Sequence, residues 1–187
     1  MRIFSRPPEP ALASDAHAHP YDLARLDSAA ETTRRTLGVV CAASAWGEDD
    51  FLYNENLAHT GGGVALCFGV HPQQPLAENR IAAIGECGFD LFNAAYRETE
   101  AAQQEFFTLQ IEAAARAGLP VVLHVRRAMH KVFEHIAALR RLKAVVFPAY
   151  AGTAAETAAL VRRGVNAYFS FGNALRLNHK HARAACA

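Results

Sequence analysis

Long apolar segments are absent from this sequence. A helix that spans a membrane needs about 18 or more consecutive apolar residues, and no run of that length occurs. The first eight residues combine two arginines with two prolines and contain no apolar stretch of the kind that a signal peptide needs. These absences predict no membrane association, and we expect a cytoplasmic protein.

Cysteine is scarce as well. The four cysteines, Cys41, Cys67, Cys87 and Cys186, are widely spaced and form no Cys-x-x-Cys pair. This spacing disfavours a disulfide framework and a thiolate metal site, and three of the four lie in apolar runs typical of buried strands. Linkers, repeats and low-complexity tracts are missing too. With 51% hydrophobic and 20% charged residues, the chain is expected to fold as a single domain over residues 1–187.

The net charge is small, at +1, but the two signs are unevenly distributed. Residues 1–112 contain 7 of the 19 lysines and arginines and 16 of the 18 aspartates and glutamates, so positive charge is in excess in residues 113–187. One interpretation is a basic surface that attracts phosphate; the other is two helical faces that neutralise each other. The basic residues in question are Arg126, Arg127, Lys131, Arg140, Arg141, Lys143, Arg162 and Arg163.

Short apolar or β-branched runs alternate with segments of helical periodicity along the whole chain. This alternation is typical of βα units with a parallel sheet, and so of the α/β class. Seven strands are predicted, at residues 12–17, 37–43, 64–70, 81–86, 119–125, 144–149 and 165–171. The helices between them are predicted at residues 22–35, 48–59, 97–117, 129–141, 153–163 and 173–185.

Seven strands are one fewer than a closed (β/α) barrel requires, and such barrels usually have about 250 residues. The first and the seventh strand would then be edges with unpaired backbone groups. A homodimer partner, the proline-rich N-terminal arm or a missing C-terminal segment could cover these edges. The chain stops within a helical pattern, at residues 182–187, which predicts a truncated barrel.

The first predicted strand ends in two histidines, His17 and His19, within the segment Asp15–His19. Since side chains alternate along a strand, both imidazoles lie on one face and can bind one metal ion. A second His-x-His pair, His179 and His181, lies in a helical pattern, where positions i and i+2 do not face each other. The position at a strand end therefore favours the first pair as metal ligands.

Two further strands end in side chains that bind metals or anions. Glu86 ends the fourth predicted strand, beside glycines that permit a sharp turn. His124 ends the fifth, and Arg126 follows on the same face as a candidate phosphate ligand. Taken singly, Glu86 would more simply be an ion-paired loop residue, and His124 a hydrogen-bonded core residue. Three strand ends that each offer a ligand favour a metal site.

These segments, in their order along the chain, resemble the TatD family of metal-dependent deoxyribonucleases in the amidohydrolase superfamily. The resemblance implies a TIM-type barrel, here with seven of its eight strands, and hydrolysis of phosphodiester bonds, often exonucleolytic on DNA. It also implies one or two divalent cations. The donor types present suit zinc, manganese or nickel, and the family is also associated with magnesium. The motifs that carry the resemblance are Asp15–His19, Phe68–Pro72, Gly85–Asp90 and Pro120–Arg126.

The same resemblance implies roles for individual residues. His17 and His19 would hold one ion. Glu86 would bridge two ions and act as the catalytic carboxylate, and His124 would bind the second ion. His71 would line the substrate site, and a histidine that only caps the turn before Pro72 is an equally good interpretation.

The sequence departs from the family pattern at two metal ligands. After the sixth strand the family has a metal-binding histidine, whereas this chain has Pro148. The family's final aspartate, on the eighth strand, falls beyond Ala187. A second ion would then keep only Glu86 and His124 as protein ligands. A one-ion site with two histidines, Glu86 and an open position is still expected.

The resulting hypothesis is a hydrolase in which metal-activated water attacks a phosphodiester and Arg126 stabilises charge on the phosphoryl oxygens. A low rate is expected without the final aspartate, which would accept the proton. One alternative is an inactive relative that binds metal or nucleic acid without turnover, which Pro148 favours. Another is a fragment with no function of its own. The substrates that fit are nucleic acids or small phosphodiesters.

Overall fold

The computed structural model describes residues 13–45, 47–60, 62–68, 81–177 and 180–186. Within these ranges it contains seven strands, whose order in the sheet follows their order in the sequence. The first and last strands are its edges, so both the predicted strand count and the two predicted edges are confirmed for the described residues. The strands are β1 (Ala13–Ala18), β2 (Val39–Ala45), β3 (Val64–Phe68), β4 (Ala83–Asp90), β5 (Val121–Arg126), β6 (Val145–Phe147) and β7 (Ala167–Phe169).

Helices follow β1, β2, β4, β5, β6 and β7 along the chain, and every strand pair for which a register is defined is parallel. No helix in the described part of the chain is long and apolar enough to cross a membrane. The helices are α1 (Pro20–Leu26), α2 (Ala30–Thr36), α3 (Glu48–His59), α4 (Ala94–Glu98), α5 (Glu100–Ala117), α6 (Met129–Glu134), α7 (Ile136–Leu139), α8 (Ala154–Arg162), α9 (Asn173–Arg176) and α10 (Lys180–Cys186).

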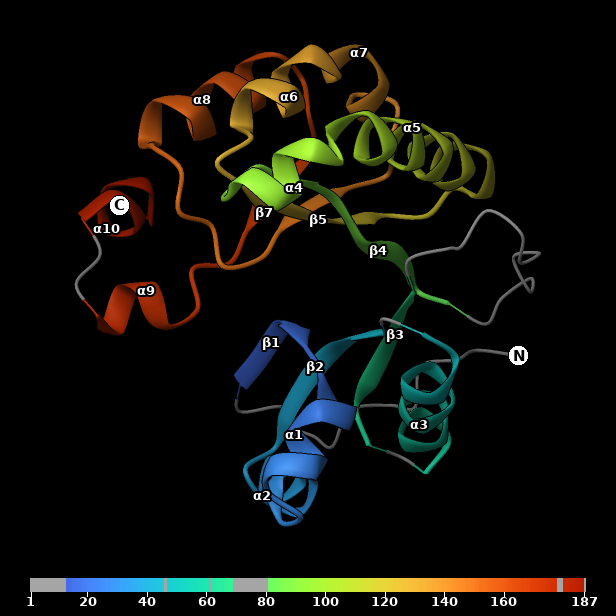
Figure 1. Cartoon of the computed structure of the whole chain (residues 1–187). Coiled ribbons are helices and arrows are strands. Elements are labelled where there is room, and N and C mark those ends of the chain that lie inside the picture. The colour runs from blue at the N-terminus through green and yellow to red at the C-terminus, as the bar shows by residue number, and fades with distance from the viewer. Residues whose placement is uncertain (1–12, 46, 61, 69–80, 178–179, 187) are drawn as a thin grey trace. The chain divides into compact units, whose positions relative to one another are not determined.

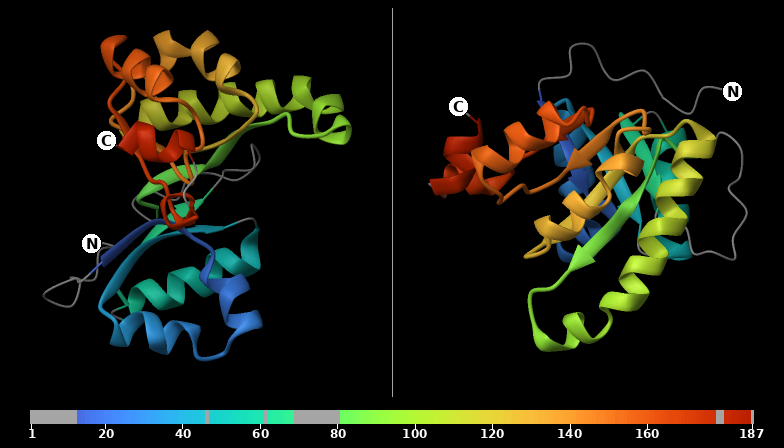
Figure 2. Two further views of the ribbon diagram at one scale, coloured as in Figure 1. Left: turned by 90° about the vertical axis from the view of Figure 1, so that its left-hand side faces the viewer. Right: turned by 90° about the horizontal axis from the view of Figure 1, so that it is seen from above.

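The chain divides into two compact units, unit 1 (Met1–Glu86) and unit 2 (Cys87–Ala187). The boundary falls within β4. In unit 1, α1, α2 and α3 lie on one side of β1, β2 and β3; in unit 2, α5 to α8 lie on one side of β5 to β7 (Figures 1 and 2). That residues 1–187 form a single domain stays a prediction.

The core of unit 1 is formed by small and medium-sized side chains. Burial raises the pKa of Cys41 to about 11 and that of Cys67 to about 12. Cys41, Cys67 and Cys87 are all buried, which confirms their predicted character as small apolar residues. The main buried cluster joins β2, α3 and β3 through Cys41, Ala43, Leu57, Ala58, Val64 and Leu66.

Arg34 connects α2 to the two strands beside it. Its guanidinium donates hydrogen bonds to the backbone carbonyls of Val39, at the start of β2, and Gly62, which precedes β3. It also donates to both carboxylate oxygens of Glu31, each at 2.8 Å. Burial raises the pKa of Glu31, but the hydrogen bonds from Arg34 and Arg35 outweigh it, so that the net pKa is lowered.

Aromatic and aliphatic side chains form the core of unit 2. The rings of Phe89, on β4, and Phe107, on α5, have centroids 4.7 Å apart, and the ring of His135 lies 4.9 Å from that of Phe107. Such contacts add to the stability gained by burying the rings. Other fully buried residues of this unit are Leu123, Val132, Leu139, Val145, Phe147 and Leu160.

Gly88 allows the last residues of β4 to lie close against β5. Its φ is +145°, and a Cβ at this position would overlap the backbone carbonyl of His124. Only glycine adopts this conformation without strain and without a steric clash. The amide of Leu91 donates to the carbonyl of Arg126 at 2.9 Å, which holds the ends of the two strands together.

The helix predictions were correct in position but not in continuity. The helix at 48–59 is confirmed with its bounds, whereas the stretch 22–35 contains two helices, α1 and α2. The break occurs because Asp27 is extended, with φ −143°, and its Oδ1 accepts a hydrogen bond from the amide of Ala29. A short polar side chain competes here with the helical hydrogen bonds.

Candidate metal centre

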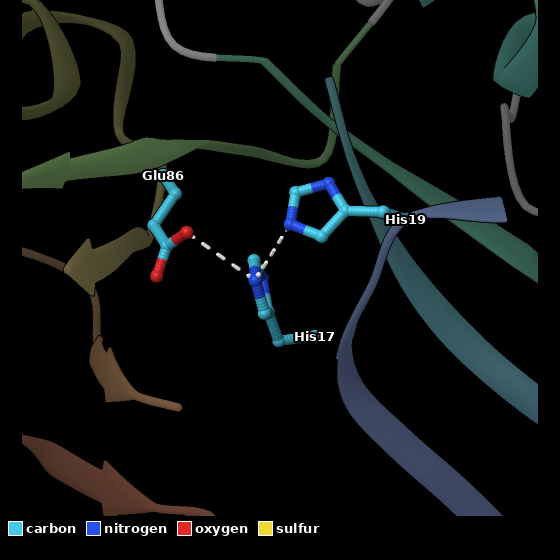
Figure 3. Close-up of side chains that lie close together, drawn as sticks. All are labelled: His17, His19 and Glu86. Atoms are coloured by element: carbon cyan, nitrogen blue, oxygen red, sulfur yellow. Dashed lines mark hydrogen bonds and ion pairs between the residues drawn. The ribbon is translucent and has the colours of Figure 1, made fainter. Parts of the chain in front are cut away.

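The structure brings three of the expected ligands together in unit 1. Nε2 of His17 lies 3.1 Å from Nε2 of His19 and 3.3 Å from Oε2 of Glu86. One ligand atom from each of the three side chains lies within 4.8 Å of the others (Figure 3). His17 belongs to β1, His19 precedes α1, and Glu86 belongs to β4, so the cluster joins two strands that lie far apart in sequence.

A register shift at the end of β1 helps to aim the histidines. Asp15 pairs with Cys41 and Ala18 with Ala43, so that β1 uses one more residue than β2 over this interval. Such a bulge redirects the side chains that follow it and is common beside active sites. Oδ1 of Asp15 accepts a hydrogen bond from the amide of His17 at 3.0 Å and supports the bend.

Ser44, on β2, orients both imidazoles from behind. Nδ1 of His17 lies 3.0 Å from its hydroxyl, and Nδ1 of His19 donates to its backbone carbonyl at 3.2 Å. A carbonyl only accepts, so in the neutral His19 the proton is on Nδ1 and the lone pair is on Nε2. Hydrogen bonds of this kind fix the tautomer and orientation of histidines that bind metals.

Asn54, on α3, holds Ser44 in place. Its amide donates to the carbonyl of Ser44 at 3.4 Å, and the Asn54 and Ser44 side chains are both buried. Neither residue was singled out from the sequence. Ser44 could have been noticed as a polar residue at the end of an apolar strand that neighbours β1, but the role of Asn54 depends on how α3 packs against β2.

The three donors fit a divalent transition-metal ion. In a tetrahedral site with bonds of about 2.0–2.1 Å, neighbouring ligand atoms lie about 3.3 Å apart. Two of the three separations in this cluster, 3.1 and 3.3 Å, are close to that value, and all three are within 4.8 Å. Imidazole nitrogens and a carboxylate oxygen are also the donor types that zinc, manganese and nickel accept.

The environment of His19 favours its neutral form. Burial lowers the pKa of this imidazole, and the neighbouring His17 lowers it further, while Glu86 acts in the opposite direction. A neutral imidazole is the form that binds a metal ion.

His124 and Arg126 occur together in unit 2, on β5. Nε2 of His124 lies 3.0 Å from Oδ2 of Asp90, and Nη1 of Arg126 lies 3.9 Å from the same oxygen. Among the described residues, the group of potential metal ligands contains only His17, His19 and Glu86. The role of His124 as a ligand of a second ion, and that of Arg126 as a phosphate ligand, stay predictions.

Asp90 was part of a motif in the sequence but was given no function there. It lies four positions after Glu86 on β4, an even spacing that puts both side chains on one face of a regular strand. This periodicity was the signal that could have identified it. Of the other expected positions, His71 lies outside the described residues, and Pro148 directly follows β6 and offers no side-chain donor.

Comparison with known proteins gives one family match and several relatives. The family model described as "TatD related DNase" matches residues 14–187. The 3'-5' ssDNA/RNA exonuclease TatD of Escherichia fergusonii is 34% identical over 90 residues, which are 48% of this chain and 34% of that protein. The protein of the same name from Cronobacter sakazakii is 37% identical over 89 residues, 47% of this chain and 33% of that protein. These alignments span about a third of the length of the curated relatives.

A solved structure shows the same fold. The crystal structure of YJJV, a TatD homologue from Escherichia coli, superposes with a TM-score of 0.68 at 22% sequence identity. The match covers 85% of this chain and 67% of that one. The predicted fold class, α/β of the TIM type with seven strands described, is thereby confirmed.

Proposed function

The chain belongs to the TatD related DNase family, whose model matches it over residues 14–187, and from this we propose that it is a metal-dependent hydrolase of phosphodiester bonds. The proposed substrate class is single-stranded nucleic acid, by analogy with relatives named as ssDNA/RNA exonucleases. The observation that carries the proposal is the convergence of His17, His19 and Glu86 at 3.1 and 3.3 Å.

These three side chains would hold one divalent cation. When bound, the cation supplies a Lewis acid, which lowers the pKa of water and so provides a nucleophile near neutral pH. His17 and His19 would bind through Nε2, because Ser44 engages Nδ1 of both rings. Glu86 would add a negative charge, which compensates part of the charge of the cation.

Other side chains of the chain have supporting roles in this proposal. Arg126 binds a phosphate of the substrate and offsets the charge that develops on its oxygens. Asp90 holds His124 through Nε2, at 3.0 Å, and so limits the orientations that its ring can adopt. Glu86 contributes to catalysis as a metal ligand, and His71 is proposed to line the substrate site.

A second candidate function is binding of metal or nucleic acid without turnover. Pro148 favours it, because this chain offers no imidazole at the position after β6. Both candidates share the site at His17, His19 and Glu86, and only turnover distinguishes them. We further propose a cytoplasmic location and a homodimer that covers an edge strand; Tyr168 of β7 is 55% exposed, which is consistent with such a contact.

Metal content and hydrolysis test the proposal together. We expect about one ion per chain by elemental analysis after loading with zinc or manganese, and none in a His17→Ala, His19→Ala double variant. A fluorescent single-stranded oligonucleotide should be cleaved by the wild type and not after chelation. His181→Ala is the matched control, since His181 lies on α10 and outside the metal group.

Each result has a separate meaning. Cleavage that persists in the double variant and in the presence of chelator would contradict a metal-dependent hydrolase. Metal binding without cleavage of single-stranded DNA or RNA, in any divalent ion tested, would favour the binding function instead. Absence of metal from the wild type would rule out the hydrolase and the metal-binding function, and would leave only binding of nucleic acid without turnover.

A further inference from the structure

The end of β5 in unit 2 carries two consecutive arginines that contact one aromatic ring. Cζ of Arg126 lies 3.7 Å from the centroid of the Phe92 ring, and Cζ of Arg127 lies 4.7 Å from it. Phe92 is 39% exposed, and the side chain of Arg126 is 51% exposed. An exposed aromatic ring covered by two cations is not explained by the packing of the core.

Local backbone geometry creates this arrangement. Consecutive side chains of a strand point to opposite faces, so Arg126 and Arg127 would normally diverge. Arg127 has φ +55°, in the left-handed region that non-glycine residues rarely adopt, and this turns its side chain toward the same ring. Phe92 is held in turn by its amide, which donates to Oδ1 of Asp90 at 2.9 Å.

The charges of Arg126, Arg127 and Asp90 do not cancel. Asp90 lies 3.9 Å from Arg126 and also receives a hydrogen bond from His124. Within the ranges that the structure describes, Arg127 makes no ion pair. By contrast, Lys131, from the same basic stretch, is paired with Glu100 and Glu134 at 2.9 and 3.1 Å. The region around Phe92 therefore carries two guanidinium groups and one shared carboxylate.

The geometry of the guanidinium group points to the ligand. An arginine that stacks on a ring keeps its in-plane N–H donors free, and these match the oxygens of a phosphate in a bidentate manner. We propose that Arg126, Arg127 and Phe92 form a phosphate clamp for the backbone of single-stranded nucleic acid. Arg127 binds a phosphate, and Phe92 positions both guanidinium groups. The choice of nucleic acid as the ligand rests on the proposed function.

The clamp is tested by binding in the absence of metal. Fluorescence anisotropy is measured with a labelled single-stranded DNA of about 12 nucleotides. EDTA is present, so that no metal-dependent cleavage occurs during the measurement. Arg127→Ala should weaken binding about tenfold, because one charge-assisted contact is lost. The slope of log Kd against log salt should fall by about 0.7, the value for one phosphate contact on a single strand.

Matched variants separate the clamp from a general charge effect. Arg116→Ala removes one positive charge from α5, where the Arg116 side chain is 73% exposed and forms a long ion pair with Glu112, at 4.0 Å. This variant should change the Kd for the oligonucleotide less than about twofold. Phe92→Leu keeps an apolar side chain but removes the ring. Phe92→Leu should weaken binding several-fold. In the Phe92→Leu, Arg127→Ala double variant, the fold-increase in Kd should be smaller than the product of the fold-increases of the two single variants.

The outcomes distinguish the clamp from the catalytic proposal. Equal binding by Arg127→Ala and Arg116→Ala, or no binding by the folded wild type to DNA or RNA, overturns the clamp. Preferential binding of vesicles rich in anionic lipid over the oligonucleotide overturns it as well. Loss of binding in Arg127→Ala, in a protein that never hydrolyses its bound strand, supports the clamp while the proposed hydrolase fails.

Discussion

Ser44 and His17 are 27 residues apart in sequence, yet the hydroxyl of the one lies 3.0 Å from Nδ1 of the other. The backbone carbonyl of Ser44 also accepts a hydrogen bond from Nδ1 of His19. Ser44 therefore orients both imidazoles. The geometry of the proposed metal site therefore depends on the pairing of β1 with β2 as well as on His17, His19 and Glu86 themselves.

Replacement of Ser44 by alanine tests this dependence. Ser44→Ala removes the hydroxyl but leaves the backbone carbonyl, so we expect metal affinity to fall about tenfold while the stoichiometry is retained. Titration calorimetry of the metal-free protein with zinc or manganese measures it. Ser28→Ala, in the exposed turn between α1 and α2, is the control. Unchanged affinity in Ser44→Ala would mean that the hydroxyl does not orient His17.

The ion-pair group around Glu31 predicts a pH-dependent stability. The pKa of Glu31 is lowered in the folded state, so this carboxylate stabilises the fold above its unfolded pKa, and the contribution is lost as the pH falls through the folded pKa. Glu31→Gln should therefore reduce the free energy of unfolding by about 1–2 kcal/mol at neutral pH and by less in acid.

Urea unfolding of Glu31→Gln at neutral and acidic pH gives the comparison. Glu112→Gln is the matched control, since its pair with Arg116 is exposed and 4.0 Å long and should contribute less than about 0.5 kcal/mol. The same loss of stability at both pH values would show that the carboxylate charge of Glu31 is not what stabilises unit 1.

Gly88 should tolerate no side chain. Gly88→Ala places a Cβ against the carbonyl of His124 and at a φ of +145°, so β5 has to move. We expect a loss of about 3 kcal/mol or more in the free energy of unfolding. Gly118→Ala, with φ +64° and open space around it, should cost only about 1 kcal/mol. Similar stability of the two variants would contradict the steric explanation.

Pro148→His would introduce an imidazole directly after β6. If this position is a ligand position, as the family pattern implies, the variant should bind metal more tightly, by about tenfold, and hydrolyse oligonucleotides faster. Pro148→Ala removes the proline without adding a donor and should show neither gain. Equal behaviour of the two variants in metal titration and in turnover would exclude a ligand role for this position.

Periodicity was sufficient to predict the strands and the convergence of three candidate ligands. Alternation put His17 and His19 on one face, and the parallel order of strands put Glu86 at the same sheet edge. The breaks within helices could not be obtained in this way. The extended backbone of Asp27 separates α1 from α2 through one side-chain hydrogen bond, which depends on local geometry rather than on apolar spacing.

Contacts between distant segments were also beyond the sequence pattern. Ser44 and Asn54 support the histidines only because α3 packs on β2, and Asp90 reaches His124 only because Gly88 lets β4 approach β5. The bulge at the end of β1 adds a residue that regular alternation does not include. Each of these features needs the register of neighbouring strands, which a single sequence does not specify.

The rate at which the buried thiols are chemically modified reports on the opening of the structure around them. Cys41 and Cys67 are buried in unit 1 and Cys87 in unit 2, whereas Cys186 is exposed. Because burial shields a thiol from the reagent, an alkylating reagent should modify Cys186 at once and the other three only when the structure around them opens. Modification of Cys41, Cys67 and Cys87 at a common rate would mean that residues 1–187 unfold as one cooperative domain. Separate rates would mean that the two units open independently.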